Sequence, residues 1–327
     1  SLQDQLFFKD VPLVKKALGL PRKVALLKGR ANYLCPYRLT LHQEEARFLT
    51  RETAEQLQIV AHWAGRTKTG DIAELQQIAE DAPVWPWVTS TADNCLGTDC
   101  PNYQECPLMK ARKEAQEADL VVVNHHLFFA DAALRGNGSA SELLPSANTV
   151  IFDEAHQLPE IAAAFFGDTL STRQVQELGR DSLSEAGHTA ADLARLNQLI
   201  AAVEKGCLDL RLSLGDGERR EPWSEVAEKE TVIEAGETLL TALRDLEMFL
   251  GPLAKASRGM EACARRASEQ VDCLAAYLKG EQPNRVYWFE TFKRTVVLHS
   301  TPLSVAAQLR AQRERQPCSW VLTSATL

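Results

Sequence analysis

Residues 149–156 read Thr-Val-Ile-Phe-Asp-Glu-Ala-His. The apolar run predicts a strand of a parallel sheet buried on both faces, because its hydrophobicity is continuous rather than alternating. Two adjacent carboxylates, Asp153 and Glu154, follow at its carboxyl end, the edge where ligands bind in open α/β sheets. This is the layout of a Walker B site. We expect Asp153 to hold Mg²⁺ beside nucleotide phosphates and Glu154 to polarise the attacking water.

Asp-Glu pairs are common in proteins, so the identification of this site depends on the residues around the pair. Three apolar or aromatic residues, Val150, Ile151 and Phe152, precede it and Ala155-His156 follows, and the whole segment resembles motif II of superfamily 2 helicases. Such an ATPase also needs a P-loop, G-x-x-x-x-G-K-[ST]. No Gly-Lys dipeptide occurs in the chain, and its first methionine is Met109. We therefore expect the P-loop to lie upstream of Ser1, and this chain alone not to hydrolyse ATP.

Further apolar runs predict more strands. They lie at residues 24–27, 119–124, 286–289, 295–298 and 321–322. From about Leu158 to Lys279 the sequence is instead rich in Ala, Leu and Glu with long amphipathic stretches, which predicts helices and no strand. The pattern therefore indicates an α/β protein with a helical insertion.

The cysteines fall into two sets. Cys95, Cys100 and Cys106 form a C-x4-C-x5-C run, and Cys35 lies alone upstream. Without a secretory signal, such cysteines are better metal or cluster ligands than disulfide partners. Four thiolates suit a [4Fe–4S] cluster or structural zinc, although zinc sites usually come as two close pairs. The remaining cysteines lack this spacing and are expected to be ordinary side chains: Cys207, Cys263, Cys273 and Cys318.

Charge is distributed unevenly along the chain. There are 36 Lys and Arg against 44 Asp and Glu, a net charge of −8, so any nucleic-acid site must be local. Between Lys9 and Arg38, eight basic residues stand against one acid, Asp10. This stretch is either a solvated basic face or such a local site. No apolar run is long enough for a membrane span and no secretory segment is present, which favours a cytoplasmic protein.

Five motifs occur in a fixed order. They are Lys28-Gly-Arg-Ala-Asn-Tyr-Leu-Cys35, the C-x4-C-x5-C run, Val121-Val-Val-Asn-His-His-Leu127, Asp153-Glu-Ala-His156 and Leu322-Thr-Ser-Ala-Thr-Leu327. Together they resemble the iron–sulfur superfamily 2 DNA helicases of the XPD/DinG group, on the DinG-like YoaA branch. The resemblance covers essentially the whole chain.

The resemblance implies an α/β fold: a partial RecA-like P-loop motor domain with an iron–sulfur insertion and an all-helical arch insertion. The implied ranges are 1–34, 119–159 and 285–327 for the motor domain, 35–118 for the iron–sulfur domain, and 160–284 for the arch. Motif I and the second motor domain are missing from this pattern. We therefore expect the chain to be a fragment of a longer helicase.

The resemblance also implies roles for individual residues. Cys35, Cys95, Cys100 and Cys106 would ligate a [4Fe–4S] cluster. Asp153 and Glu154 would act on ATP and Mg²⁺, and His156 would couple nucleotide state to DNA contact. Motif III, linking hydrolysis to strand movement, would be Ser324, Ala325 and Thr326. The implied activity is ATP-dependent 5′→3′ translocation on single-stranded DNA and unwinding of forked DNA in replication or repair, in a nucleoid-associated protein with unnamed protein partners.

Contacts with DNA are expected in the basic stretch, which lies beside the first cluster ligand. Lys28, Arg30 and Tyr33 are the residues expected to make them. Trp85 and Trp87 are able to stack on bases, although such aromatic residues more often pack in a core. His125 and His126 point to opposite sides of a strand end, which favours hydrogen-bonded structural histidines over metal ligands.

Two other classes of function stay open from the sequence. A non-catalytic nucleic-acid-binding module, braced by zinc or a cluster at the four cysteines, explains the basic stretch without any hydrolysis. A zinc-stabilised interaction protein explains the cysteines alone and predicts a colourless protein containing zinc. ATP hydrolysis by a longer chain separates the helicase from the first class, and metal analysis separates it from the second.

Overall fold

The chain forms two compact units. The computed structural model describes residues 2–19, 21–44, 50–136, 143–186, 193–280, 284–315 and 318–325. The first unit contains residues 1–165 and 306–327, and the second contains residues 166–305. Within the described ranges, no helix combines the length and the apolar character that crossing a bilayer requires.

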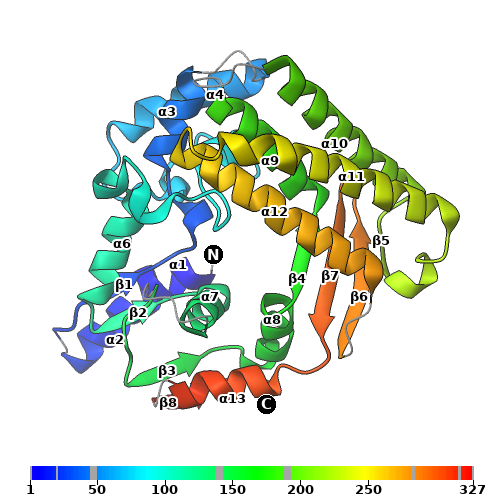
Figure 1. Cartoon of the computed structure of the whole chain (residues 1–327). Coiled ribbons are helices and arrows are strands. Elements are labelled where there is room, and N and C mark those ends of the chain that lie inside the picture. The colour runs from blue at the N-terminus through cyan, green and yellow to red at the C-terminus, as the bar shows by residue number, and fades with distance from the viewer. Residues whose placement is uncertain are drawn as a thin grey trace. The chain divides into compact units, whose positions relative to one another are not determined.

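Two pairs of parallel strands organise the first unit (Figure 1). β1 (Val24–Leu26) pairs with β2 (Leu120–Val122), and β3 (Thr149–Phe152) pairs with β8 (Ser319–Leu322). Parallel neighbours require a crossover connection. The connection from β1 to β2 contains the C-x4-C-x5-C run and Cys35, whereas the connection from β3 to β8 contains the whole second unit. These strands confirm the α/β prediction and four of the predicted runs.

The expectation that these strands are buried on both faces is wrong for this chain. Phe152 is buried, but its neighbour Ile151 is 65% exposed. One face of the β3–β8 pair is covered by Phe128, whose ring contacts Phe152 and Trp320 at centroid distances of 4.9 and 5.9 Å. Each sheet has only two strands among the described residues, and packing of this kind covers one side of it.

The helices of the first unit are mostly short. α1 is held on the sheet by Gln3, whose Nε2 donates to the carbonyls of Leu27 and Val122 at 3.0 and 3.3 Å. The α- and π-helices of the unit are α1 (Leu2–Gln5), η1 (Leu6–Asp10), α2 (Val11–Leu18), α3 (Pro36–Glu44), α4 (Arg51–Ala64), α5 (Trp85–Val88), α6 (Pro107–Gln116), α7 (His125–Gly136), α8 (Leu158–Phe165) and α13 (Ala306–Arg315). Its 3₁₀ turns are η2 (Arg30–Asn32), η4 (Ile72–Glu74), η5 (Gly97–Asp99), η6 (Tyr103–Glu105) and η7 (Ala155–Gln157).

The second unit combines long helices with one antiparallel sheet (Figure 1). The helices are α9 (Thr172–Ala186), α10 (Leu193–Ser213), α11 (Glu230–Leu253) and α12 (Arg258–Lys279), with the 3₁₀ turn η8 (Trp223–Glu225). The strands are β4 (Asp168–Ser171), β5 (Arg219–Pro222), β6 (Arg285–Thr291) and β7 (Val296–Pro302), in the order β4-β7-β6-β5. One apolar core joins the helices to the inner face of the sheet.

This sheet corrects the expected all-helical insertion at 160–284. The segment contains β4 and β5, and the strands expected to belong to the motor domain pair with them in the second unit. β4 and β5 are the edge strands, each of four residues, with the sequences Asp-Thr-Leu-Ser and Arg-Arg-Glu-Pro. Short polar edge strands lack the apolar run by which a strand is recognised from sequence.

Candidate functional site

The predicted carboxylates lie where two parallel strands end side by side. Phe152 of β3 is in register with Leu322 of β8, so Asp153 and Thr323 are the next residues at the same edge. The Thr323 hydroxyl donates to Asp153 Oδ1 at 2.9 Å. Backbone hydrogen bonds extend the pairing, since the Thr323 N–H donates to the Phe152 carbonyl at 2.8 Å and the Ala155 N–H donates to the Thr323 carbonyl at 2.9 Å. The Asp153 side chain is therefore fixed by its neighbouring strand.

Glu154 has an unusual backbone conformation. Its φ and ψ are 52° and 45°, in the left-handed region that non-glycine residues rarely adopt. Such a residue costs on the order of 1–3 kcal/mol and persists where the surrounding structure fixes it. Here the Glu154 N–H donates to Asp153 Oδ1 at 3.0 Å, and η7 begins at the next residue. The turn directs two consecutive carboxylates out of the end of the strand.

His156 connects this turn to the segment after β8. Its Nδ1 lies 2.8 Å from Ser324 Oγ and 3.3 Å from Glu154 Oε2. The structure thus brings the predicted residues Glu154 and His156 together with Ser324, which lies 168 residues after His156 in the sequence. Ala325 follows and is exposed, whereas the predicted Thr326 lies outside the described residues.

The carboxylate edge is open to solvent. Asp153 is exposed, and Glu154 and His156 are 40% and 44% exposed at their side chains. Oδ1 of Asp153 accepts two hydrogen bonds, and among the described residues Oδ2 accepts none. One carboxylate oxygen is therefore held in place while the other is available to a ligand from solution.

Two residues at this edge were not assigned to it from the sequence. One is Thr323, which precedes the predicted motif III and contacts Asp153 directly. The other is His125, which begins α7 after β2 and hydrogen-bonds the backbone of Asp153. Burial, together with the nearby His126, lowers the pKa of His125 despite that bond. Their positions after β8 and β2 were the available signal, because carboxyl ends of parallel strands gather at one edge.

Cys35 is held against a segment far along the chain. Its N–H donates to the Val88 carbonyl at 2.7 Å, and the preceding Leu34 N–H donates to the Gly70 carbonyl at 2.9 Å. Arg38, buried and one turn further along α3, donates from Nη2 to the Pro86 carbonyl at 2.9 Å. These bonds place the isolated cysteine beside the segment that leads into the C-x4-C-x5-C run.

Two of the predicted ligands stand at helix N-termini. Cys35 directly precedes α3 and Cys106 directly precedes α6, and each is followed by a proline at the first helical position. Proline is favoured there because its missing N–H would be unpaired in any case. The partial positive charge of a helix N-terminus stabilises a thiolate. At Cys35 this contribution of the helix N-terminus opposes the effect of burial, which favours the neutral thiol.

The four predicted thiols interact electrostatically. Burial raises the pKa of Cys35 to about 11, Arg38 opposes that shift, and Cys95 and Cys100 add to it. Burial likewise raises the pKa of Cys100, with further contributions from Cys95 and Cys106. All four are free thiols. Within the described part of the chain, no three Cys, His, Asp or Glu side chains form a group that could hold one metal ion.

Thiolates are the usual ligands of iron–sulfur clusters and are common ligands of structural zinc. A cationic side chain accompanies the sulfurs, because Arg112 on α6 interacts electrostatically with Cys95 and Cys106. Arg112 is half-buried, and burial together with the charge of Arg30 lowers its pKa. The other cysteines are also free thiols and are buried or half-buried: Cys207, Cys263, Cys273 and Cys318.

Two residues predicted to contact DNA, Lys28 and Tyr33, are buried within the first unit. Lys28 is 6% exposed, and its Nζ lies 2.9 Å from Asp4 Oδ1 and 2.7 Å from Asp71 Oδ2. Burial lowers the pKa of Lys28, but the two carboxylates outweigh it and raise the pKa above its usual value. Tyr33 is also buried, and its hydroxyl accepts the Lys28 N–H at 3.2 Å. A contact with DNA stays a prediction only for Arg30, which is half-buried.

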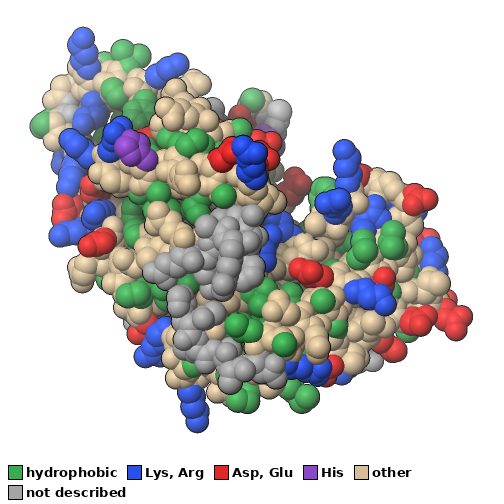
Figure 2. Space-filling model, turned by 90° about the horizontal axis from the view of Figure 1, so that it is seen from above, with side chains coloured by type: hydrophobic (Ala, Val, Ile, Leu, Met, Phe, Trp, Pro, Cys, Tyr) green, Lys and Arg blue, Asp and Glu red, His purple; other side chains and the backbone are tan. Residues whose placement is uncertain are grey.

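The rest of the basic stretch is partly neutralised. Arg22 pairs with Asp119 at 3.4 Å, and Lys23 pairs with Glu117 at 2.8 Å. On the face seen in Figure 2, Lys and Arg side chains stand at many points with Asp and Glu side chains between them. The count of basic residues in the sequence therefore overstates the free positive charge.

Trp85 and Trp87 pack inside the first unit. Trp85 is buried, and its Nε1 donates to the Ala79 carbonyl at 2.7 Å. Trp87 makes an edge contact with His42 at a centroid distance of 4.9 Å. Both belong to one apolar cluster, which supports core packing over base stacking.

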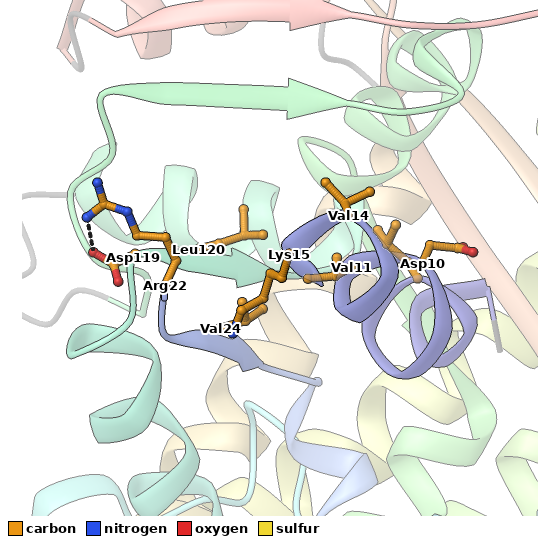
Figure 3. Close-up of a pocket in the computed structure, with 9 residues that line it drawn as sticks. Asp10, Val11, Val14, Lys15, Arg22, Val24, Asp119 and Leu120 are labelled. Atoms are coloured by element: carbon orange, nitrogen blue, oxygen red, sulfur yellow. Dashed lines mark hydrogen bonds and ion pairs between the residues drawn. The ribbon is translucent and has the colours of Figure 1, made fainter. Parts of the chain in front are cut away.

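A cavity of about 400 Å³ lies elsewhere in the first unit, between η1, α2 and the β1–β2 pair (Figure 3). Apolar side chains such as Val11, Val14, Val24 and Leu120 line most of it. Its charged residues include Arg22 and Asp119, which pair with each other. None of the predicted site residues lines this cavity, so the carboxylate edge is the better candidate for chemistry.

Comparison with known proteins agrees with this geometry. The family model described as DEAD_2 matches residues 65–175. The chain is 42% identical over 332 residues to the ATP-dependent DNA helicase YoaA of Haemophilus influenzae, covering 100% of this chain and 51% of that protein. It is 40% identical over 331 residues to YoaA of Escherichia coli (strain K12), with the same coverage. It is 32% identical over 176 residues to the ATP-dependent DNA helicase DinG of that strain, covering 50% of this chain and 24% of DinG.

The parallel strands that end in the Asp-Glu-Ala-His turn, and the similarity along the whole chain, support a relationship to the DinG-like helicases. Among these proteins, the YoaA helicases are similar to the chain over its whole length. The chain spans about half the length of these YoaA relatives.

Proposed function

We propose that this chain is part of an ATP-dependent DNA helicase that moves 5′→3′ along single-stranded DNA and unwinds forked duplexes. One observation carries the proposal. At the end of β3 and β8, Thr323 fixes Asp153 and Ser324 contacts His156, so the two predicted helicase motifs meet through their side chains. The names of the similar YoaA and DinG proteins support the same activity.

The residues of this edge have distinct roles in the proposed reaction. Asp153 would hold the Mg²⁺ of the nucleotide, and the metal would neutralise negative charge on the phosphates. Glu154 orients and polarises the attacking water, a role that needs a carboxylate projecting beyond the strand. His156 contacts both Glu154 and Ser324, so a change at the nucleotide reaches the segment after β8. That contact is the proposed link between hydrolysis and strand movement through motif III.

Cys35, Cys95, Cys100 and Cys106 are proposed to hold a [4Fe–4S] cluster within residues 35–118. The support is the set of free, mutually interacting thiols, two helix N-termini and nearby Arg38 and Arg112. When bound, the cluster supplies a rigid covalent cross-link between distant parts of the segment. The chain's own residues hold Cys35 in place through the bonds from residues 34–38 to residues 70–88. This region would act as a wedge at the fork, with Arg30 facing the DNA.

The second unit is proposed to be the arch of the helicase, with bounds of 166–305 in place of the expected 160–284. Its compact core and its long helices suit a rigid element that helps to enclose single-stranded DNA. The longer protein supplies the P-loop and the second motor domain, and the expected location is the cytoplasm at the nucleoid. This chain by itself is proposed to be inactive as an ATPase, because it has no Gly-Lys dipeptide.

The test uses the longer protein from the same source. ATP hydrolysis is measured with and without single-stranded DNA, and unwinding is measured on duplexes with a 5′ or a 3′ single-stranded tail. We expect DNA-stimulated hydrolysis and unwinding of the 5′-tailed duplex only. No stimulation by DNA would contradict the helicase function and favour a non-catalytic binding module. Unwinding of only the 3′-tailed duplex would contradict the proposed direction.

A further inference from the structure

The sheet of the second unit has one buried face and one open face. Alternation along β6 directs Phe289 into the core, where it is fully buried. The residues on either side of it, Trp288 and Glu290, point the other way and are half-buried. On the edge strand β5, Arg220 lies on that same outer face, since it is in register with Glu290, and its side chain is 66% exposed. The outer face therefore presents aromatic and cationic groups to solvent.

These groups form a stack across three strands. Trp288 is in register with His299 of β7, and their rings are 3.8 Å apart at the centroids and inclined by only 6°. Arg220 Cζ lies 4.2 Å from the centroid of the Trp288 ring. Because β7 and β5 flank β6 on opposite sides, Trp288 lies between His299 and Arg220. The stack therefore ends at the sheet edge in a guanidinium group.

Neighbouring side chains hold the stack in this arrangement. Trp288 Nε1 donates to Thr301 Oγ1 at 2.9 Å, which fixes the plane of the ring. The Glu290 carboxylate lies 3.7 Å from Arg220 Nε and 3.5 Å from His299 Nε2, so it lies beside the residues at both ends of the stack. A guanidinium is planar, and one of its faces is occupied by Trp288. The other face is preorganised to receive a second planar group.

We propose that the outer face of Arg220 is a stacking position for a base of single-stranded DNA. The inference rests on the proposed helicase function, and it names one contact of the second unit with the strand. Sheets that bind single strands commonly stack bases on aromatic or arginine planes. Lys293 and Arg294 lie in the β6–β7 turn near the Arg220 end of the sheet and are exposed. Among the described residues neither forms an ion pair, so both are available to phosphates.

The local charge balance indicates which force dominates at this position. Glu290 accompanies Arg220, and Asp216 and Glu218 lie in the segment just before β5. The negative charges of these acids offset the positive charges of Arg220, Lys293 and Arg294. The phosphates of a bound strand therefore contribute little net attraction. Stacking must then supply most of the contact, and recognition depends on the base rather than on backbone charge.

The test measures fluorescence anisotropy of labelled strands bound by the full chain. One strand is an oligothymidylate, and the other has the same length and charge but tetrahydrofuran in place of every base. The variants are R220A, which removes the plane and the charge, and R220K, which keeps only the charge. R258A is the control, because Arg258 on α12 is exposed and pairs with Glu261 at 2.7 Å.

Wild type should bind oligothymidylate more tightly than the abasic strand. R220A and R220K should both weaken oligothymidylate binding by at least about 5-fold and leave abasic binding unchanged, while R258A should change neither. Wild-type affinity in R220K, or an equal loss on both strands in R220A, would overturn the stacking inference and leave the helicase proposal intact. A wild-type chain that binds neither strand would overturn the inference, whereas DNA-stimulated hydrolysis by the longer protein would still support the helicase.

Discussion

The two units bury their apolar side chains to different extents. In the second unit one core joins four helices and a sheet, and residues such as Leu246 and Phe289 are fully buried. In the first unit the apolar side chains form several smaller clusters, and strand residues remain exposed, with Ile151 at 65% and Leu322 at 49%. The predicted catalytic and cysteine residues all lie in this less consolidated unit. Chemistry and packing are therefore concentrated in different parts of the chain.

Among the changes that test this difference between the two units, a substitution at the carboxylate edge should have the largest effect. In the longer protein, E154Q should lower DNA-stimulated ATP hydrolysis by at least about 100-fold, because the amide cannot polarise the attacking water. Nucleotide binding should persist, since Asp153 is unchanged. The matched control is E234Q on α11, where Glu234 is exposed, and hydrolysis should change by less than about 2-fold. Equal losses in the two variants would show that the carboxylate edge has no special role.

Replacing one cysteine in each unit tests which of the two units binds iron. C100S should abolish iron binding by the chain purified under anaerobic conditions, because a cluster needs its full thiolate set. C273S, in the second unit, should retain the iron of wild type. The measurement is iron per chain together with visible absorbance. Retention of iron in C100S would remove this cysteine from the site.

Glycine replacement tests the tight packing of the second unit. A Cβ at Gly206 of α10 would lie 3.1 Å from Leu239 Cα of α11, so G206A should push the helices apart and lower the free energy of unfolding by about 1–2 kcal/mol. A Cβ added at Gly251 of α11 would meet no atom within 4 Å beyond its chain neighbours and the backbone of its own helix, and G251A should raise the free energy of unfolding by up to about 1 kcal/mol. Urea unfolding followed by circular dichroism measures both. Destabilisation by both variants would point to helix disruption rather than packing.

The smallest expected effect is a pH dependence in the first unit. The pKa of His125 is lowered in the folded chain, so the unfolded chain binds the proton more readily. Stability should therefore fall as the pH drops below the unfolded value of about 6.5 and continue to fall until the folded pKa is passed. H125Q should remove part of this loss, by less than about 1 kcal/mol between pH 7 and pH 5. Urea midpoints at the two pH values test it.

H126Q is the matched control for that measurement, because His126 is the exposed neighbour. It should retain most of the pH dependence of wild type. If H125Q and wild type lose the same stability on acidification, the environment of His125 does not favour its neutral form.

The strands of the first unit were predictable because their apolar runs are continuous, whereas their pairing is known only from the structure. The edge strands β4 and β5 were not predictable, because a short polar strand is stabilised by its neighbours rather than by its own sequence. The same limit applies to single residues. Asp153, His156 and Ser324 were predicted from motifs, whereas the burial of Lys28 depends on Asp4 and Asp71, which are distant in sequence. Local patterns identify strand ends, but they do not reveal which cations are already paired.

Metal analysis of the purified chain is the most direct test of the proposed iron–sulfur cluster. The chain is prepared without oxygen, its visible spectrum is recorded, and iron and zinc are measured per chain. We expect a broad absorbance band near the blue edge of the spectrum and roughly four iron atoms per chain. Zinc without iron, even after anaerobic reconstitution, would contradict the iron–sulfur assignment and leave the carboxylate edge as the remaining support for a helicase.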